Sequence, residues 1–118
     1  MAREERADEL SWLPATTLAG MIKRKKVSPV EVVNAILARI EALNPILNAF
    51  VTLTADQARR DARAAERALG KRGATLGPLH GVPFSVKDLV ITRGVRTTFG
   101  TPRPSCARTG AGSSAPWS

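Results

Sequence analysis

Residues 79–88 read LHGVPFSVKD and combine a turn, a short apolar run and a lysine. The run from Val82 to Val86 has the length of a β-strand, and Pro83 stands near its start, where a strand tolerates proline. Lys87 follows the run directly. Because burial disfavours the ammonium form, a lysine beside an apolar strand can act as a base near neutral pH. Lys87 is therefore a candidate catalytic residue; in the competing interpretation it pairs with Asp88 or points into solvent.

Helical patterns precede this stretch. A first helix is expected to begin near Pro14 and to end at the basic run 23–26, whose charge suits a helix C-terminus. Ser28, Pro29 and Glu31 form a capping box with proline at the first helical position, which predicts a second helix. Asn44-Pro45 is expected to end that second helix.

A third helix is expected over residues 54–69, with alanines along one face. An alanine stripe buries little area for each residue, so this helix should lie close against a larger surface. Three segments are rich in strand-forming residues: 48–53, 82–86 and 89–92. The expected order is therefore helices first, with strand or extended segments between and after them.

A family resemblance adds to this interpretation. The run 79–88, followed by Gly94, Thr97-Thr98 and Gly100, resembles the N-terminal signature of the amidase signature family. The family's pattern is Gly-(Ile/Val)-Pro, three variable residues, Lys-Asp, then Gly and a Thr-Thr-x-Gly turn. The upstream elements that also fit are Ser28-Pro29-Val30-Glu31, Ala38-Arg39-Ile40-Glu41, Asn44-Pro45 and Asn48-Ala49-Phe50-Val51.

The resemblance implies a fold and a mechanism. The fold would be of the α/β class, comprising the N-terminal helices and first strands of a mixed-sheet domain, here incomplete. The activity would be hydrolysis of carboxamide C–N bonds by a nucleophilic Ser, a second Ser held by a cis peptide, and a Lys as general base. Lys87 matches that Lys. No metal or organic cofactor is implied, and the one Cys and one His are too few for a protein-only zinc site.

The family's two serines are expected several dozen residues beyond Lys87, farther than this chain extends. Gly112-Ser113-Ser114 resembles that segment but comes too soon, so we reject it as the nucleophile. Residues 102–118 contain no Val, Ile, Leu, Met or Phe and are expected to be disordered. We interpret them as the product of a frameshift or truncation in an amidase gene, a hypothesis that sequencing across codon 101 tests. The chain by itself is then expected to be inactive.

The predicted organisation is a flexible N-terminus over 1–11, the N-terminal part of an amidase signature domain over 12–101, and the tail over 102–118. The parent enzyme would act on a small-molecule amide. These motifs do not separate a free amidase from the A component of a glutamyl-tRNA amidotransferase, which would add partner proteins. Without a signal peptide or membrane-spanning segment, the expected location is the cytoplasm.

The charge of the chain leaves another hypothesis open. The net charge is +8; residues 1–66 carry a balance of +1 and residues 67–118 a balance of +7, with Asp88 the one acid in the second part. A small basic nucleic-acid-binding protein is therefore the alternative. Few aromatic residues are available for stacking on bases, so no nucleic-acid partner is expected.

Overall fold

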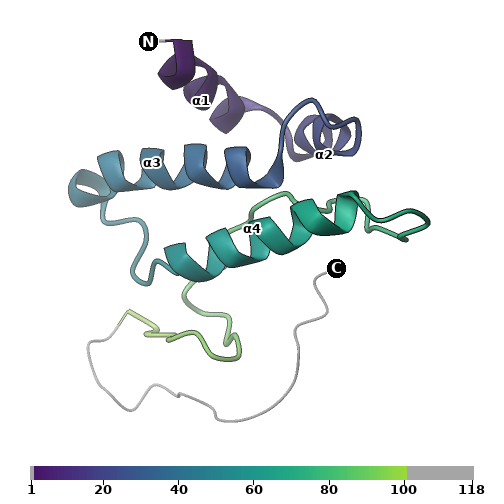
Figure 1. Ribbon diagram of the computed structural model, residues 1–118. Helices are drawn as coiled ribbons and strands as arrows, with labels where there is room; N and C mark the ends of the chain where they lie inside the picture. Colours follow the sequence, from purple (N-terminus) through teal and green to yellow (C-terminus); the bar gives the residue numbers. More distant parts are fainter. Residues whose placement is uncertain (1, 101–118) are drawn as a thin grey trace.

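The computed structural model describes residues 2–100, which form a helical layer followed by an extended segment (Figure 1). The helices are α1 (Ala2–Trp12), α2 (Ala15–Lys23), α3 (Pro29–Leu47) and α4 (Ala55–Leu69). Both α1 and α4 pack against α3, the longest helix. The main core lies between α1, α2 and α3, and its buried members are Leu10, Leu18, Ile22, Val27, Val32 and Ala35.

Helix α1 forms where the sequence was expected to be flexible. Leu10, only 3% exposed, joins the main core and anchors the helix. Two ion pairs attach α1 to α3: Arg6 to Glu31 at 3.1 Å, and Asp8 to Arg39. Leu10, with Ala7 beside it, and ion-pair partners more than twenty positions away hold this helix, and neither gives a periodic local pattern.

The start of α3 confirms Ser28 as the N-cap, which is one half of the predicted capping box. The Ser28 Oγ accepts a hydrogen bond from the Glu31 backbone N–H at 3.0 Å, and Pro29 occupies the first turn. The Glu31 carboxylate pairs with Arg6. The helix start therefore follows from local chemistry, with Glu31 serving also as an anchor for α1.

We expect Ser28→Ala to lower the free energy of unfolding by about 1 kcal/mol, because a helix N–H loses its acceptor. Urea unfolding followed by circular dichroism measures the change. Ser85→Ala is the control, since Ser85 is exposed and lies outside the helices. Equal stability of the Ser28 variant and the wild type would contradict the capping role.

Helix α3 does not end at Asn44-Pro45 as predicted, because Pro45 lies inside the helix, which continues to Leu47. A proline this close to the C-terminus costs few ladder hydrogen bonds. Asn48 then ends the helix in a left-handed conformation, with φ of 49°. The Asn44 side chain bonds both the N–H and the C=O of Phe50, at 2.8 and 3.1 Å, which turns the chain toward α4.

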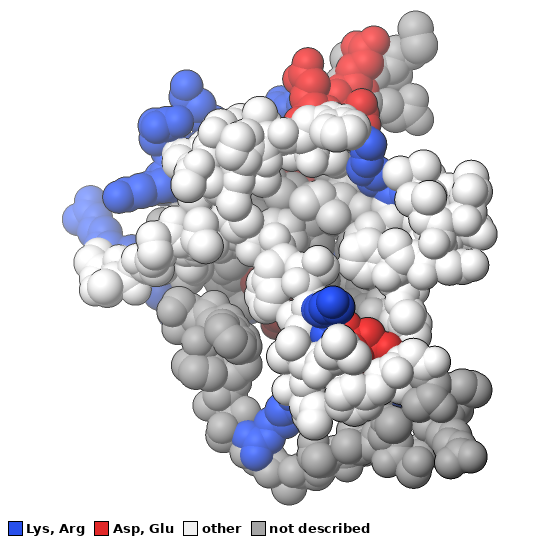
Figure 2. Space-filling view, turned by 180° about the vertical axis from the view of Figure 1, so that it is seen from behind, with Lys and Arg blue, Asp and Glu red and all other residues white. Residues whose placement is uncertain are grey.

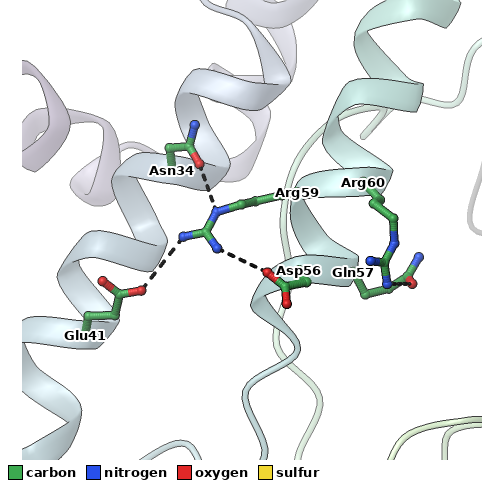
Figure 3. Close-up of polar contacts among 6 residues, drawn as sticks. All are labelled: Asn34, Glu41, Asp56, Gln57, Arg59 and Arg60. Atoms are coloured by element: carbon green, nitrogen blue, oxygen red, sulfur yellow. Dashed lines mark hydrogen bonds and ion pairs between the residues drawn. The ribbon is translucent and has the colours of Figure 1, made fainter.

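Helix α4 lies alongside α3 as its alanine stripe predicted (Figure 1). Ala62 is buried against Val33 and Leu37 of α3, so the two backbones approach closely. Arg59 crosses the interface to the Asn34 side chain at 3.4 Å and to Glu41 at 3.8 Å, and also contacts Asp56 on its own helix (Figure 3). The contact combines small apolar residues with a polar rim.

Strands are absent from the described part of the chain, so the segments 48–53, 82–86 and 89–92, expected to be strands or extended pieces, form no sheet. The observed architecture over residues 2–100 is helical, and the mixed sheet of the predicted α/β fold is not formed. A strand exists only through hydrogen bonds to a neighbouring strand. Strand propensity in residues 82–92 therefore produces extended backbone and turns here.

Three further expectations concern the C-terminal tail, membrane-spanning helices and the basic run 23–26. The predicted tail, residues 102–118, lies outside the described residues. Among helices α1 to α4, none is both long and apolar enough to cross a membrane. The basic run 23–26 is exposed, with Lys23 in the last turn of α2. Lys and Arg side chains gather along one edge of the molecule as seen from behind (Figure 2).

Candidate functional site

The segment that carries Lys87 returns along α4 after that helix ends. In Figure 1 it passes behind α4, and the His80 Nε2 lies 2.9 Å from the backbone oxygen of Ala65 in that helix. Two turn hydrogen bonds shape this part, from the His80 N–H to the Gly77 oxygen and from the Val82 N–H to the Leu79 oxygen. The segment that precedes Lys87 is therefore held against α4.

Gly81 lies against the helices where this segment passes α2 and α3. Its φ is +79°, a conformation that favours glycine. A Cβ at this position would lie 2.8 Å from the Pro29 Cγ and 3.3 Å from the Ile22 Cγ2. Val82 follows and packs against the main core. A side chain at residue 81 would push the segment away from α2 and α3.

Asp88 connects the run 79–88 to the Thr97-Thr98 turn that follows it. Its carboxylate accepts one hydrogen bond from the Thr98 N–H at 2.8 Å and a second from the Thr98 hydroxyl. The Asp88 backbone oxygen accepts from the Phe99 N–H at 3.3 Å, and the Gly100 N–H donates to the Thr98 hydroxyl oxygen. Together these contacts close a loop from residue 88 to residue 98, which we call the Asp88–Thr98 loop.

The threonines of this loop are its most buried residues. Thr97 is 3% and Thr98 4% exposed. The Thr97 hydroxyl donates to the Val90 oxygen across the loop, and the Thr52 hydroxyl donates to the Arg96 oxygen from the α3–α4 connection, both at 3.4 Å. The buried threonine hydroxyls therefore have hydrogen-bond partners, as buried polar groups in proteins usually do.

The hydrogen bonds from Thr98 lower the pKa of Asp88 below its ordinary value. The Thr98 hydroxyl contributes most and the Thr98 N–H next; the Gly100 N–H and the positive charge of Arg96 act in the same direction, and partial burial opposes them. All the favourable contacts stabilise the charged carboxylate. The loop therefore stabilises the ionised form of the Asp88 carboxyl group.

We expect the Asp88–Thr98 loop to loosen in acid. Because the pKa of Asp88 is lower in the folded chain, its stabilising contribution is fully present above the ordinary aspartate value of about 3.9 and is lost as the pH falls through the lowered folded value. NMR of the Thr98 amide proton should show a titration midpoint below that ordinary value.

Asp88→Asn supplies the comparison. The asparagine amide offers one carbonyl oxygen to two Thr98 donors, so one donor loses its acceptor. The variant should show faster amide exchange at Thr98 already at pH 7 and no acid titration of that amide. A Thr98 midpoint at or above the ordinary aspartate value, or the same titration in the variant, would contradict the assignment.

Lys87 precedes the loop and is exposed. Its backbone oxygen accepts a hydrogen bond from the Val90 N–H at 2.9 Å, which forms the first turn of the loop. Within residues 2–100 its ammonium group makes no ion pair, and Asp88 bonds Thr98 instead. The turn therefore constrains the backbone at Lys87, while the Lys87 side chain remains exposed.

Asp88 is the site residue whose structural role the sequence reasoning missed. The available signal was its position as the one acid between residues 67 and 118, ten positions before Thr98. Within residues 2–100, no group of three His, Cys, Asp or Glu side chains is placed to hold a metal ion. The site consists of a lysine on a turn and a loop closed by an aspartate and two threonines.

Comparison with known proteins shows what this chain is similar to. The family described as Amidase matches residues 31–105, a range that contains both Lys87 and the Asp88–Thr98 loop. An acylamidase from Rhodococcus erythropolis is 44% identical over 91 residues, covering 77% of this chain and 19% of the relative. The A component of the glutamyl-tRNA(Gln) amidotransferase from Moorella thermoacetica is 48% identical over 90 residues, covering 76% and 18%. No solved structure gives a significant match.

The fold and the site define a helical layer followed by an exposed lysine and a closed loop. The family match covers more than half of the sequence, so this chain belongs to the amidase family, as its motifs indicated. It spans about a fifth of the length of the curated relatives it matches.

Proposed function

We propose that this chain carries the N-terminal part of an amidase-type hydrolase that cleaves carboxamide C–N bonds, with Lys87 as its general base. The observation that carries the proposal is the position of Lys87 next to the Asp88–Thr98 loop, inside the range matched by the Amidase family. The hydrogen bonds of that loop set the backbone from which Lys87 projects.

In the proposed mechanism, Lys87 acts in its neutral form. It accepts a proton from the cis-peptide serine, which takes the proton of the nucleophilic serine as that oxygen attacks the amide carbon. Lys87 then returns the proton toward the leaving amine as the C–N bond breaks, and water hydrolyses the acyl-enzyme. Both serines would come from amidase sequence beyond this chain.

The neutral lysine requires a less polar environment than the one described here. Lys87 is exposed in residues 2–100, and burial is what favours the uncharged form of a lysine. We therefore propose that further amidase sequence covers Lys87 and completes the sheet to which residues 82–92 would contribute. The isolated chain is then inactive.

A chimera tests the proposed function. The 91 residues of the Rhodococcus acylamidase that match this chain are replaced by the corresponding residues of the chain, and hydrolysis of simple carboxamides is measured beside the isolated chain. We expect activity in the chimera and none in the chain. An active isolated chain, or a folded chimera without activity, would contradict the proposal.

The 48% identity to the Moorella amidotransferase component favours a second candidate. As part of such a component, the chain would assemble with the other amidotransferase proteins. A chimera with the Moorella protein distinguishes the candidates, because only the second predicts co-purification of that chimera with the remaining components. Hydrolysis of free amides without such assembly would favour the first candidate.

A further inference from the structure

Lys87 and Asp88 are sequence neighbours of opposite charge, yet the structure holds the Asp88 carboxylate elsewhere. Thr98 donates to both of its oxygens: the Thr98 N–H to Oδ1 at 2.8 Å and the Thr98 hydroxyl to Oδ2. Thr98 is only 4% exposed, so both bonds are shielded from water, which strengthens them. Within residues 2–100 the Lys87 ammonium group has no ion-pair partner. A contact across ten positions thus takes the place of a contact between neighbours.

An ion pair between these neighbours would oppose the proposed chemistry. An opposite charge within about 4–6 Å favours the charged form of an ionisable group. A general base must be neutral before it accepts a proton, so a carboxylate against the Lys87 ammonium group would keep that base protonated. The hydrogen bonds from Thr98 satisfy the carboxylate and hold it within the loop.

The other charges around the carboxylate do not replace Thr98. The remaining charged side chains of the Asp88–Thr98 loop are Arg93 and Arg96. The charge of Arg96 acts on Asp88, but its effect is smaller than that of either hydrogen bond from Thr98. Residues 48–54, which also contact the loop, contain no charged residue. Thr98 is therefore the main partner of the carboxylate.

We propose that Thr98 is a positioning residue for Lys87: it holds the Asp88 carboxylate in the loop and thereby keeps the neighbouring lysine out of an ion pair. This inference rests on the proposed function, in which Lys87 is the general base. Thr98 touches neither substrate nor the reacting atoms and acts on Lys87 through Asp88. Its hydroxyl is the part that a substitution removes, because the backbone N–H stays.

Competitive acetylation of the 118-residue chain tests the charge separation without measuring activity. Trace acetic anhydride reacts with neutral amines, and mass spectrometry compares Lys87 with the exposed Lys71 in the same sample. In Thr98→Val, the Asp88 Oδ2 loses the hydroxyl donor and becomes available to the Lys87 ammonium group. We expect the labelling ratio of Lys87 to Lys71 to fall about two- to fivefold, the range that corresponds to an exposed ion pair.

Three further variants control this measurement. Thr98→Ser keeps the hydroxyl and should keep the wild-type ratio. Thr97→Val removes an equally buried hydroxyl that donates to the Val90 oxygen, so it should leave the ratio unchanged. Adding Asp88→Asn to Thr98→Val removes the carboxylate charge and should abolish the decrease. Circular dichroism of each variant checks that the helices remain.

The pH dependence of kcat/KM in the acylamidase chimera shows whether the separation serves catalysis. Thr98→Val should move the acidic limb of the profile to higher pH by about one unit, because an ion pair favours the protonated base. Activity should then recover at alkaline pH. Loss of loop structure alone would lower the rate at every pH and leave the limb in place. Thr98→Ser should keep the wild-type profile.

The outcomes separate this inference from the proposed function. An unchanged labelling ratio in Thr98→Val, or an equal decrease in Thr97→Val, overturns the inference, and so does an active Thr98→Val chimera whose acidic limb does not move. The expected labelling change together with a folded chimera that hydrolyses no amide supports the separation of charges and counts against the proposed function. An active chimera with an unchanged labelling ratio does the reverse.

Discussion

Lys87→Ala in the active chimera is expected to lower kcat about 10²–10⁴-fold, the usual contribution of a general base. KM should change far less, because the proposed role of Lys87 is proton transfer and not substrate binding. Steady-state kinetics on a simple carboxamide measures both constants. The effect is large because both transfers, from the serine relay and to the leaving amine, pass through one nitrogen atom.

Lys87→Arg separates a base from a fixed positive charge. Arginine keeps the charge and much of the length of lysine but does not lose its proton in proteins. The arginine variant should therefore be as inactive as the alanine variant. Lys71→Ala is the control, because Lys71 is an exposed lysine just after α4 and should leave kcat within about twofold. Substantial activity in either Lys87 variant would remove the residue from the mechanism.

Gly81→Ala is expected to lower the free energy of unfolding of the chain by about 2–5 kcal/mol. A left-handed conformation costs a non-glycine residue about 1–2 kcal/mol. The new Cβ would also lie 2.8 Å from the Pro29 Cγ, and overpacking of this kind costs about 1–3 kcal/mol. Because the segment before Lys87 rests on α2 and α3 through this contact, the same change should displace Lys87. Urea unfolding followed by circular dichroism measures the stability.

Two other glycines isolate the contribution of the contact. Gly73 and Gly94 have φ of +71° and +75°, but a Cβ on either would meet no atom within 4 Å. Alanine at these positions should carry the conformational cost alone, about 1–2 kcal/mol. If Gly81→Ala destabilises the chain no more than these controls, the packing of residue 81 against Pro29 does not hold the segment in solution.

Local chemistry explains which features could be predicted. The Ser28 cap depends on residues three positions apart, and the alanine face of α4 on residues one turn apart, so both appear as short patterns. The motif around Lys87 could also be recognised in the sequence, and it led to the correct family. The end of α3 was predicted wrongly. Pro45 lies inside the last turn of the helix, and the helix ends two residues later at Leu47.

Contacts between distant residues explain the features that were missed. Helix α1 is held by partners in α3, and the Asp88–Thr98 loop closes across ten positions. The expected strands failed for the same reason, since a strand requires a neighbouring strand and the described residues supply none.

The sequence by itself determined the family of this protein and three of the helices that precede the motif, and it predicted Lys87 as the catalytic base. Only the tertiary structure decided that Asp88 is bound to Thr98 and that Gly81 rests on Pro29. It also decided that the apolar residues of 84–91 are exposed. The physical reason is that motifs and caps depend on neighbouring side chains, whereas loop closure, close approach and exposure depend on which distant surfaces meet.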